Sequence, residues 1–215
     1  MFNSNNIITD KLSINLQKAL KNYCIDKIFI LVDDNSLKHC FPVINKITSL
    51  KNDNIIKIET GEENKNIDTI VSIWNFLSKN NADRYSLLIN LGGGVVCDIG
   101  GFAASTFKRG IDFINIPTTL LSQVDAAVGG KTGFNFNGLK NEIGVINNAK
   151  HVFIDTIFLG SLDKENILSG FAEMIKHALI YNKKYYSELI NLDLGNTNSK
   201  EFKEAVFKSI KIKNH

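Results

Sequence analysis

The chain has 215 residues, of which 44% are hydrophobic and 22% charged, and its formal net charge is +3. This composition is that of a globular protein with a core to bury, so it excludes a disordered chain. Lysines alternate with acidic residues and form no basic blocks, which gives nucleic-acid or membrane-surface binding little support.

Features of the termini and the cysteines indicate the compartment. The first six residues lack the basic and apolar regions of a signal peptide, and no apolar run reaches the length of a membrane span. The three cysteines are widely spaced, odd in number and without a Cys-x-x-Cys pair. We therefore expect a cytoplasmic protein with free thiols and no thiolate metal site.

Four short apolar runs organise the first part of the chain. They span residues 27–32, 54–59, 86–91 and 111–116. Helical spacing follows the second run, and a helical pattern over residues 95–107 follows the third. Strands of continuous apolar character, separated by helices, predict an α/β fold: a Rossmann-like, mostly parallel sheet with helices on both faces.

From about residue 161 the pattern is helical only. We expect helices over residues 164–181, over 184–192 and from Lys200 onward. The last pattern meets no Gly or Pro, so the chain is expected to end inside a helix. These observations predict an α/β domain over residues 1–160 and the beginning of an all-helical domain over 161–215.

Polar residues and glycines gather where the predicted strands end. Ligands of parallel sheets bind at the carboxyl ends of strands, and these loops fall there: Asp33-Asp34, residues 61–65, residues 92–98 and Thr118-Thr119. Gly92-Gly93-Gly94 by itself fits a tight turn and a pyrophosphate site about equally well, and it meets Gly-x-Gly-x-x-Gly only loosely. The neighbouring strand-end loops, together with Asp98, favour a nucleotide.

Two basic residues in the following segment suggest anion binding. Gly130-Lys131-Thr132 is not a P-loop, because Asp125 stands where that motif needs glycine and residues 118–128 look helical. Lys131 could be a solvated surface lysine, but its glycine-rich setting favours an anion. Arg109 is one of only two arginines, which suggests a need for a forked, permanently charged donor.

A third group lies on the helix predicted over residues 164–181. Glu173 and His177 are four residues apart and share a face, so they could supply two ligands to zinc. A lone Glu and His on a helix are more often surface residues. Helix spacing leaves the two readings open.

The order of these motifs from Asp34 to Lys176 resembles that of 3-dehydroquinate synthases. The units that carry the resemblance are Gly-Gly-Gly-Val-Val-x-Asp98, Arg109-Gly110, Pro117-Thr-Thr-Leu-Leu-x-Gln-Val-Asp125, Gly129-Gly-Lys-Thr-Gly133, Lys140-Asn-x-Ile-Gly144 and Gly170-Phe-Ala-Glu-x-Ile-Lys176. The resemblance implies the conversion of 3-deoxy-D-arabino-heptulosonate 7-phosphate to 3-dehydroquinate and phosphate, a lyase step of the shikimate pathway in aromatic amino acid biosynthesis. It also implies NAD, a divalent metal (zinc or cobalt) and a homodimer.

The resemblance further implies the following roles, residue by residue. NAD contacts would be Asp34, Glu62, Lys65, Gly93, Gly94, Asp98, Thr118, Thr119, Lys140 and Ser161, the first three of them at the adenosine half. Asp125, Lys131, Asn141 and Lys176 would line the substrate pocket, and Arg109 would bind the substrate phosphate from the neighbouring subunit. Glu173 would be the first metal ligand.

Departures from the family pattern limit what can be transferred. The family's other two metal ligands are histidines of a Gly-His-Thr-x-x-x-His-Ala segment that this chain does not contain, and neither His177 nor His215 occupies a ligand position. Cys97 replaces a usual glycine, and residues 136–139 replace a commoner His-Pro-Leu-Gly. We therefore expect the 215 residues alone to be inactive. The alternative functions are another sugar phosphate cyclase, such as a 2-deoxy-scyllo-inosose synthase, or a glycerol-type dehydrogenase.

Overall fold

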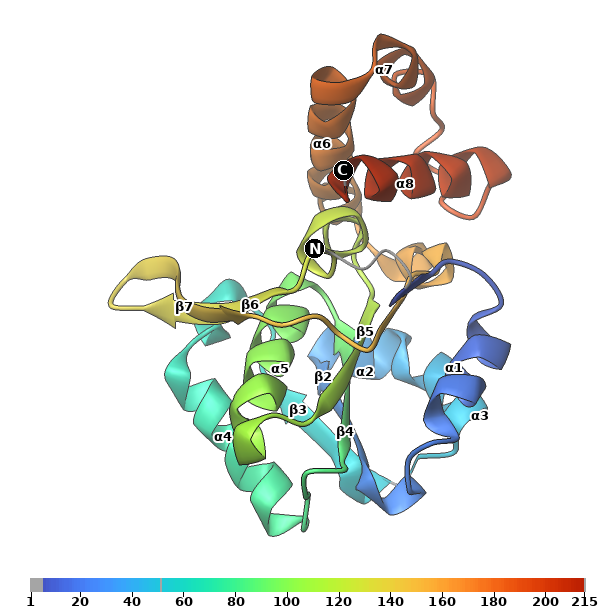
Figure 1. Ribbon diagram of the computed structural model, residues 1–215. Coiled ribbons are helices and arrows are strands. Elements are labelled where there is room, and N and C mark those ends of the chain that lie inside the picture. The colour runs from blue at the N-terminus through green and yellow to red at the C-terminus, as the bar shows by residue number, and fades with distance from the viewer. Residues whose placement is uncertain (1–5, 51, 215) are drawn as a thin grey trace.

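The computed structural model describes residues 6–50 and 52–214 (Figure 1). Residues 1–5, which carry most of the signal-peptide argument, and His215 lie outside the described residues. No helix within the described ranges is both long enough and apolar enough to cross a bilayer.

A six-stranded sheet, parallel throughout, forms the centre of the molecule. Its order is β1-β8-β5-β4-β2-β3. The strands are β1 (Ile7–Ile8), β2 (Ile28–Asp33), β3 (Ile55–Ile58), β4 (Leu87–Gly92), β5 (Asp112–Pro117) and β8 (His151–Phe153). Each of the four predicted apolar runs is a strand, and the α/β fold with a parallel sheet is confirmed. The short strands β1, at one edge of the sheet, and β8, between β1 and β5, were not predicted.

Helices cover both faces of the sheet, as the continuous apolar strands require. One face packs on α1 (Leu12–Leu20) and α3 (Phe41–Thr48), and the short helix α2 (Asp34–His39) lies on the same side of the sheet. The other face packs on α4 (Ile67–Lys79) and α5 (Gly94–Thr106). Short 3₁₀ segments connect the elements: η2 (Ile25–Lys27), η3 (Asn52–Asn54), η4 (Glu62–Asn64), η5 (Phe107–Arg109) and η7 (Thr156–Ser161).

A two-stranded antiparallel hairpin extends away from the sheet (Figure 1). It consists of β6 (Lys131–Phe136) and β7 (Leu139–Ile146). Asn137 and Gly138, with φ of 50° and 77°, form its two-residue turn. Such a turn matches the twist of the flanking strands because both central residues have positive φ. The hairpin holds three of the predicted site residues, Lys131, Lys140 and Asn141.

The last part of the chain is helical, as predicted. It contains α6 (Lys164–Tyr181), α7 (Lys183–Leu189) and α8 (Lys200–Lys213). Both α6 and α8 pack against a π-helix, η6 (Ser122–Ala126), within the segment that was predicted to be helical. Figure 1 shows these helices gathered at one end of the molecule, beyond η6. Their buried side chains join the same apolar cluster as those of α4 and α5.

Candidate cofactor pocket and metal-ligand group

A pocket of about 530 Å³ lies at the carboxyl ends of the central strands. Its position is the one expected for a ligand of a parallel α/β sheet. Eight of the ten residues that the sequence assigns to a cofactor line it: Glu62, Lys65, Gly93, Gly94, Asp98, Thr118, Thr119 and Ser161. Asp34 and Lys140 are not among the residues that line it.

The floor of the pocket includes the amino end of helix α5. Gly93 is the N-cap residue, and no side chain caps the helix there. A Cβ atom on Gly93 would lie 3.2 Å from Thr119 Cγ2, and one on Gly94 would lie 3.3 Å from Ala126 Cβ. The two glycines therefore leave room above backbone N–H groups that can bind a phosphate. A dinucleotide fits this arrangement.

The acidic residue at the end of β2 is displaced by one position from the prediction. Asp33 lines the pocket, and its carboxylate accepts a hydrogen bond from Ser36 N at 2.7 Å in a capping box of α2. Asp34 is exposed and pairs with Lys57 at 2.5 Å. From the end of β2 to the start of α3, the residues that line the pocket are Asp33, Asn35, Ser36, His39 and Cys40.

A buried ion pair lies at the side of the pocket. Lys65 Nζ donates to Asp98 Oδ2 and to Asn141 Oδ1, both at 2.5 Å. Burial raises the pKa of the Asp98 carboxyl, and Lys65 opposes that shift. Lys65 therefore joins Asp98, a predicted cofactor residue, to Asn141, a predicted substrate residue. The prediction had grouped Lys65 with Asp34 and Glu62 at the adenosine half.

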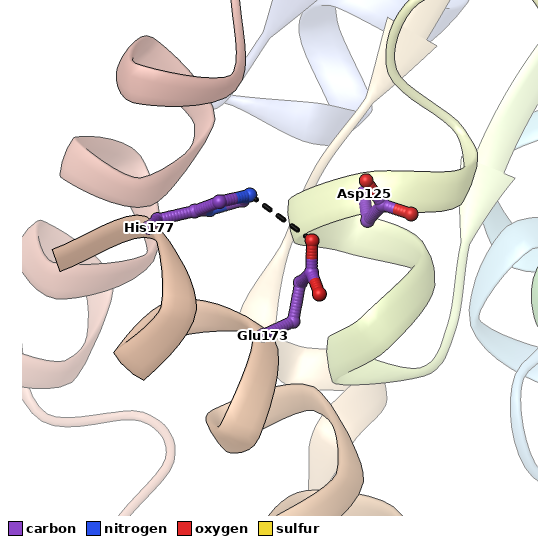
Figure 2. A group of neighbouring side chains, drawn as sticks. All are labelled: Asp125, Glu173 and His177. Carbon is purple, nitrogen blue, oxygen red and sulfur yellow. Dashed lines mark ion pairs between the residues drawn. The ribbon is translucent and has the colours of Figure 1, made fainter. Parts of the chain in front are cut away.

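Three possible metal ligands converge beside the pocket. Asp125 from η6 and Glu173 and His177 from α6 have ligand atoms within 4.8 Å of one another. In Figure 2 Glu173 and His177 extend from successive turns of α6, and Asp125 lies beside them on the neighbouring η6. Leu121, the N-cap residue directly before η6, and Ser169 in the first half of α6 also line the pocket.

The environment of His177 suits a neutral ligand nitrogen. His177 is 4% exposed, and burial lowers the pKa of its imidazole. Its Nδ1 contacts Ser209 Oγ at 2.7 Å, whereas the buried Nε2 lies 3.1 Å from Glu173 Oε1 without hydrogen-bond geometry. Two carboxylates and an imidazole are the donors that zinc accepts. The orphaned nitrogen and this donor set therefore fit a divalent cation.

Two lysines partly neutralise the acidic group. Lys176 forms an ion pair with Glu173 Oε1, and Lys213 Nζ lies 2.5 Å from Asp125 Oδ1. Lys213 was not predicted as a site residue. The sequence shows only that Lys213 lies in the last turn of an amphipathic helix. It does not show that this helix, α8, packs on η6.

The remaining predicted residues lie farther out. Lys131 and Lys140 are exposed on the hairpin. Arg109 is exposed in η5, after the carboxyl end of α5, whereas the pocket lies at the amino end of this 13-residue helix. At 1.5 Å per residue, the two ends are about 20 Å apart. The fold of one chain therefore does not bring Arg109 to its own pocket.

Comparisons with known proteins give the family context. Residues 55–169 match the family model described as 3-dehydroquinate synthase N-terminal. The chain is 48% identical over 207 residues to a 3-dehydroquinate synthase of Parabacteroides distasonis, with 96% of this chain and 59% of the relative covered. It is 44% identical to the enzyme of Clostridium tetani, with 80% of this chain and 47% of the relative covered. The chain thus spans between about half and three fifths of these relatives.

Solved structures support the fold. A 2-epi-5-epi-valiolone synthase from Streptomyces hygroscopicus subsp. jinggangensis 5008, with NAD⁺ and Zn²⁺ bound, superposes with a TM-score of 0.85 at 24% identity, covering 96% of this chain and 59% of that one. A 2-deoxy-scyllo-inosose synthase complexed with carbaglucose-6-phosphate, NAD⁺ and Co²⁺ gives a TM-score of 0.78 at 22% identity, covering 95% and 57%. At these identities the likeness concerns the fold alone.

Proposed function

Because the chain belongs to the 3-dehydroquinate synthase family, we propose that the protein that carries it converts 3-deoxy-D-arabino-heptulosonate 7-phosphate into 3-dehydroquinate and phosphate. The single observation that carries this proposal is that the candidate cofactor pocket and the candidate metal-ligand group lie next to each other. A pocket shaped for a dinucleotide borders the same two elements, η6 and α6, that bring Asp125, Glu173 and His177 together. In the proposed reaction NAD would take a hydride from the substrate and the cation would polarise the substrate oxygens, so both sites must lie close to the same substrate.

We assign NAD to the pocket. The uncapped N-terminus of α5 would hold the pyrophosphate, while Asp98, Thr118 and Thr119 line the adjoining wall. Since Asp34 pairs with Lys57 outside the pocket, Asp33 takes the place expected for Asp34. Lys140 is on the exposed hairpin, so its contact with the cofactor is proposed from the family pattern alone.

We assign a divalent cation, zinc or cobalt, to the group formed by Asp125, Glu173 and His177. Glu173 is the ligand that the family pattern supplies. Asp125 and His177 hold no ligand position in that pattern, and they are assigned here because their ligand atoms lie within 4.8 Å of that of Glu173. NAD accepts and returns a hydride when bound, and the metal polarises substrate oxygens as a Lewis acid.

The chain's own residues orient the substrate. Lys176 and Lys213 bring two ammonium groups to the edge of the metal-ligand group, where they can bind a carboxylate or phosphate. Asn141 lies on the hairpin in contact with Lys65, whereas the role of the exposed Lys131 in substrate binding is proposed from the family pattern alone. This placement makes the chain's contribution mainly one of positioning.

Several finer points belong to the same proposal. The α/β part over residues 1–160 is the cofactor domain, and residues 161–215 begin the domain that holds the metal and substrate. The protein acts as a homodimer in the cytoplasm, and Arg109 serves the site of the neighbouring subunit. The exposed place of Arg109, distant from its own pocket, supports the last point.

The proposal is tested with the protein that carries this chain. We expect phosphate release from the heptulosonate phosphate only when NAD and a divalent metal are both present, with 3-dehydroquinate as product and no net accumulation of NADH. Asp98→Asn should lower this rate, whereas Glu165→Gln in the exposed first turn of α6 should not. Phosphate release from a hexose phosphate instead would identify another cyclase, and NADH accumulation with glycerol would identify a dehydrogenase.

A further inference from the structure

One lysine is buried beside the pocket. Within residues 6–50 and 52–214, Lys65 is the only lysine, arginine, aspartate or glutamate that is buried, at 4% exposure. Burial of an ammonium group is costly unless it is paired and hydrogen-bonded. Lys65 meets this condition through Asp98 on α5 and Asn141 on β7, each 2.5 Å from Nζ. Its position therefore depends on one partner in the sheet domain and one in the hairpin.

The backbone of Lys65 is tied to the same hairpin. Its carbonyl oxygen accepts a hydrogen bond from Asn135 N at 2.8 Å. The side chain of Asn135 donates to Glu62 Oε1 at 2.9 Å and accepts from Asn141 N at 2.8 Å. Glu62, Lys65, Asn135 and Asn141 thus form one closed network, and Asp98 anchors it to α5.

The network holds a backbone conformation that the hairpin alone does not favour. Asn141 has a φ of 54°, in the left-handed region, and lies within strand β7 rather than in the turn. β7 is exposed along almost its whole length, so little apolar burial fixes it. Two hydrogen bonds hold this residue in place: Asn141 Oδ1 accepts from Lys65 Nζ, and Asn141 N donates to Asn135 Oδ1.

We propose that Lys65 is a positioning residue that fastens the β6–β7 hairpin to the floor of the cofactor pocket. It thereby holds Asn141 in position to contact the substrate. It also makes the conformational stability of the hairpin depend on the ligand bound in the pocket. An ammonium group has three N–H donors, and two are used by Asp98 and Asn141. The third is free for a cofactor oxygen, which links the pocket to the hairpin. Only this link to NAD rests on the proposed function.

Hydrogen exchange of the full 215-residue chain, followed by mass spectrometry, tests the proposal. We compare Lys65→Met with wild type in peptides that cover residues 131–146. Loss of a charge-assisted hydrogen bond should speed their exchange by about tenfold or more. Lys57→Met is the matched control, because Lys57 forms an exposed ion pair with Asp34 outside the network. Peptides from β4, the central strand, report on global opening.

A second variant keeps the test decisive if Lys65→Met opens the whole fold. Lys65→Met combined with Asp98→Asn removes both charges, so no carboxylate is left buried without its partner. Compared with Asp98→Asn alone, the double variant should still exchange faster in residues 131–146, with β4 unchanged. Equal hairpin exchange in these two variants, or in Lys65→Met and wild type, would overturn the proposal.

The addition of NAD separates positioning from a purely structural role. In wild type, saturating NAD should slow exchange of residues 131–146, and this effect should be smaller in Lys65→Met at NAD concentrations that saturate the variant, because only the direct contact of Lys140 with the cofactor would remain. An equal NAD effect in both proteins contradicts the proposed link. If wild type binds no NAD, the cofactor assignment fails, while the comparison without NAD still decides whether Lys65 positions the hairpin.

Discussion

The three cysteines have three different environments, and only one of them is exposed. Cys24 is exposed, Cys40 is buried next to the pocket, and Cys97 is buried within α5. Burial, with Asp33 nearby, raises the pKa of Cys40 to about 11. Burial also raises the pKa of Cys97 well above that of an ordinary thiol. Since the thiolate is the reactive form, both buried thiols should be inert.

This difference predicts selective alkylation. At pH 8, three units below its pKa, Cys40 is thiolate to only about one part in a thousand. Iodoacetamide should therefore modify Cys24 first, and Cys40 at least about a hundredfold more slowly, as measured by peptide mass spectrometry. The sign for stability follows from the same shift: the protonated Cys40 favours the fold, and that contribution is lost as pH rises through about 11. Modification of Cys40 as fast as Cys24 would contradict the burial.

The metal-ligand group, Asp125, Glu173 and His177, predicts which substitutions weaken metal binding. Glu173→Gln removes a ligand oxygen charge and should abolish measurable binding of Co²⁺ or Zn²⁺ to the protein that carries this chain. His177→Phe should weaken binding by about tenfold or more, because it removes the orphaned Nε2. Competition with a chromophoric chelator measures both affinities.

The matched control for the metal experiment is Glu188→Gln. Glu188 forms an exposed ion pair with Lys208, at 2.5 Å, on α7 and α8. Its loss should leave metal affinity unchanged. An affinity of His177→Phe equal to that of wild type would show that Nε2 is not a ligand and that the imidazole serves α6 and α8 through Ser209 alone.

Among single residues, eight of the ten predicted for the cofactor line the pocket, but their detailed contacts could not be predicted. Gly93, Gly94 and Asp98 were expected from a strand-turn-helix pattern, which is local. That Asp33 rather than Asp34 lines the pocket could not be predicted, because it depends on where α2 begins after β2, with Asp33 as its N-cap. Lys213 could not be found, because its meeting with Asp125 depends on how α8 packs on η6.

Among the elements, helix α6 is placed by a close approach at Gly170. A Cβ atom there would lie 2.5 Å from the backbone N of Leu121 and 2.6 Å from Leu120 Cβ. Only glycine allows α6 to pack so closely on the segment that leads into η6. This contact sets the distance between Glu173 on α6 and Asp125 on η6.

Gly170→Ala should therefore destabilise the protein although alanine favours helices. Overpacking against backbone costs about 1–3 kcal/mol, and the gain in helix propensity of roughly 1 kcal/mol offsets part of it. We expect a net loss of roughly 1–2 kcal/mol in urea unfolding and weaker metal binding. Gly160→Ala is the control, since a Cβ there meets nothing within 4 Å, and it should change stability by less than about 0.5 kcal/mol. Equal stability of the two variants would contradict the close packing.

The elements that the sequence predicted are those with strong local patterns. The four central strands are continuously apolar, and α6 begins and ends at the predicted residues. The β6–β7 hairpin was missed even though Asn137-Gly138 is a favoured hairpin turn, because β7 is exposed along almost its whole length and neither strand shows a clear apolar alternation. β1 and β8 are too short to carry a pattern, and they form because β8 pairs with β5 and β1 in turn pairs with β8.

At the scale of the whole molecule, Arg109 lies far from the pocket of its own chain. Lys108, Arg109 and Gly110 all have positive φ, so the backbone turns sharply after α5 and presents Arg109 to solvent. This backbone conformation costs free energy at Lys108 and Arg109, although not at Gly110, and such conformations cluster at functional sites. In the proposed homodimer, Arg109 reaches the substrate phosphate of the neighbouring subunit.

This arrangement predicts complementation between two inactive variants of the protein that carries this chain. Arg109→Ala lacks the residue given to the neighbour, and Glu173→Gln lacks a ligand of its own site. In a mixed dimer, the site with Glu173 intact receives Arg109 from the Glu173→Gln subunit, while the other site lacks both. Random reassortment makes half of the dimers mixed, each with one of two sites restored, so activity should recover to about a quarter of wild type.

The measurement is phosphate release after the two variants are unfolded together and refolded. Each variant refolded alone is the control and should stay inactive, and Arg109→Ala should still bind NAD, because Arg109 does not line the pocket. If Arg109 served the site of its own chain, every site in a mixed dimer would lack either Arg109 or Glu173, and mixing would restore nothing. Recovery on mixing therefore requires both a dimer and a pocket completed by the neighbouring chain.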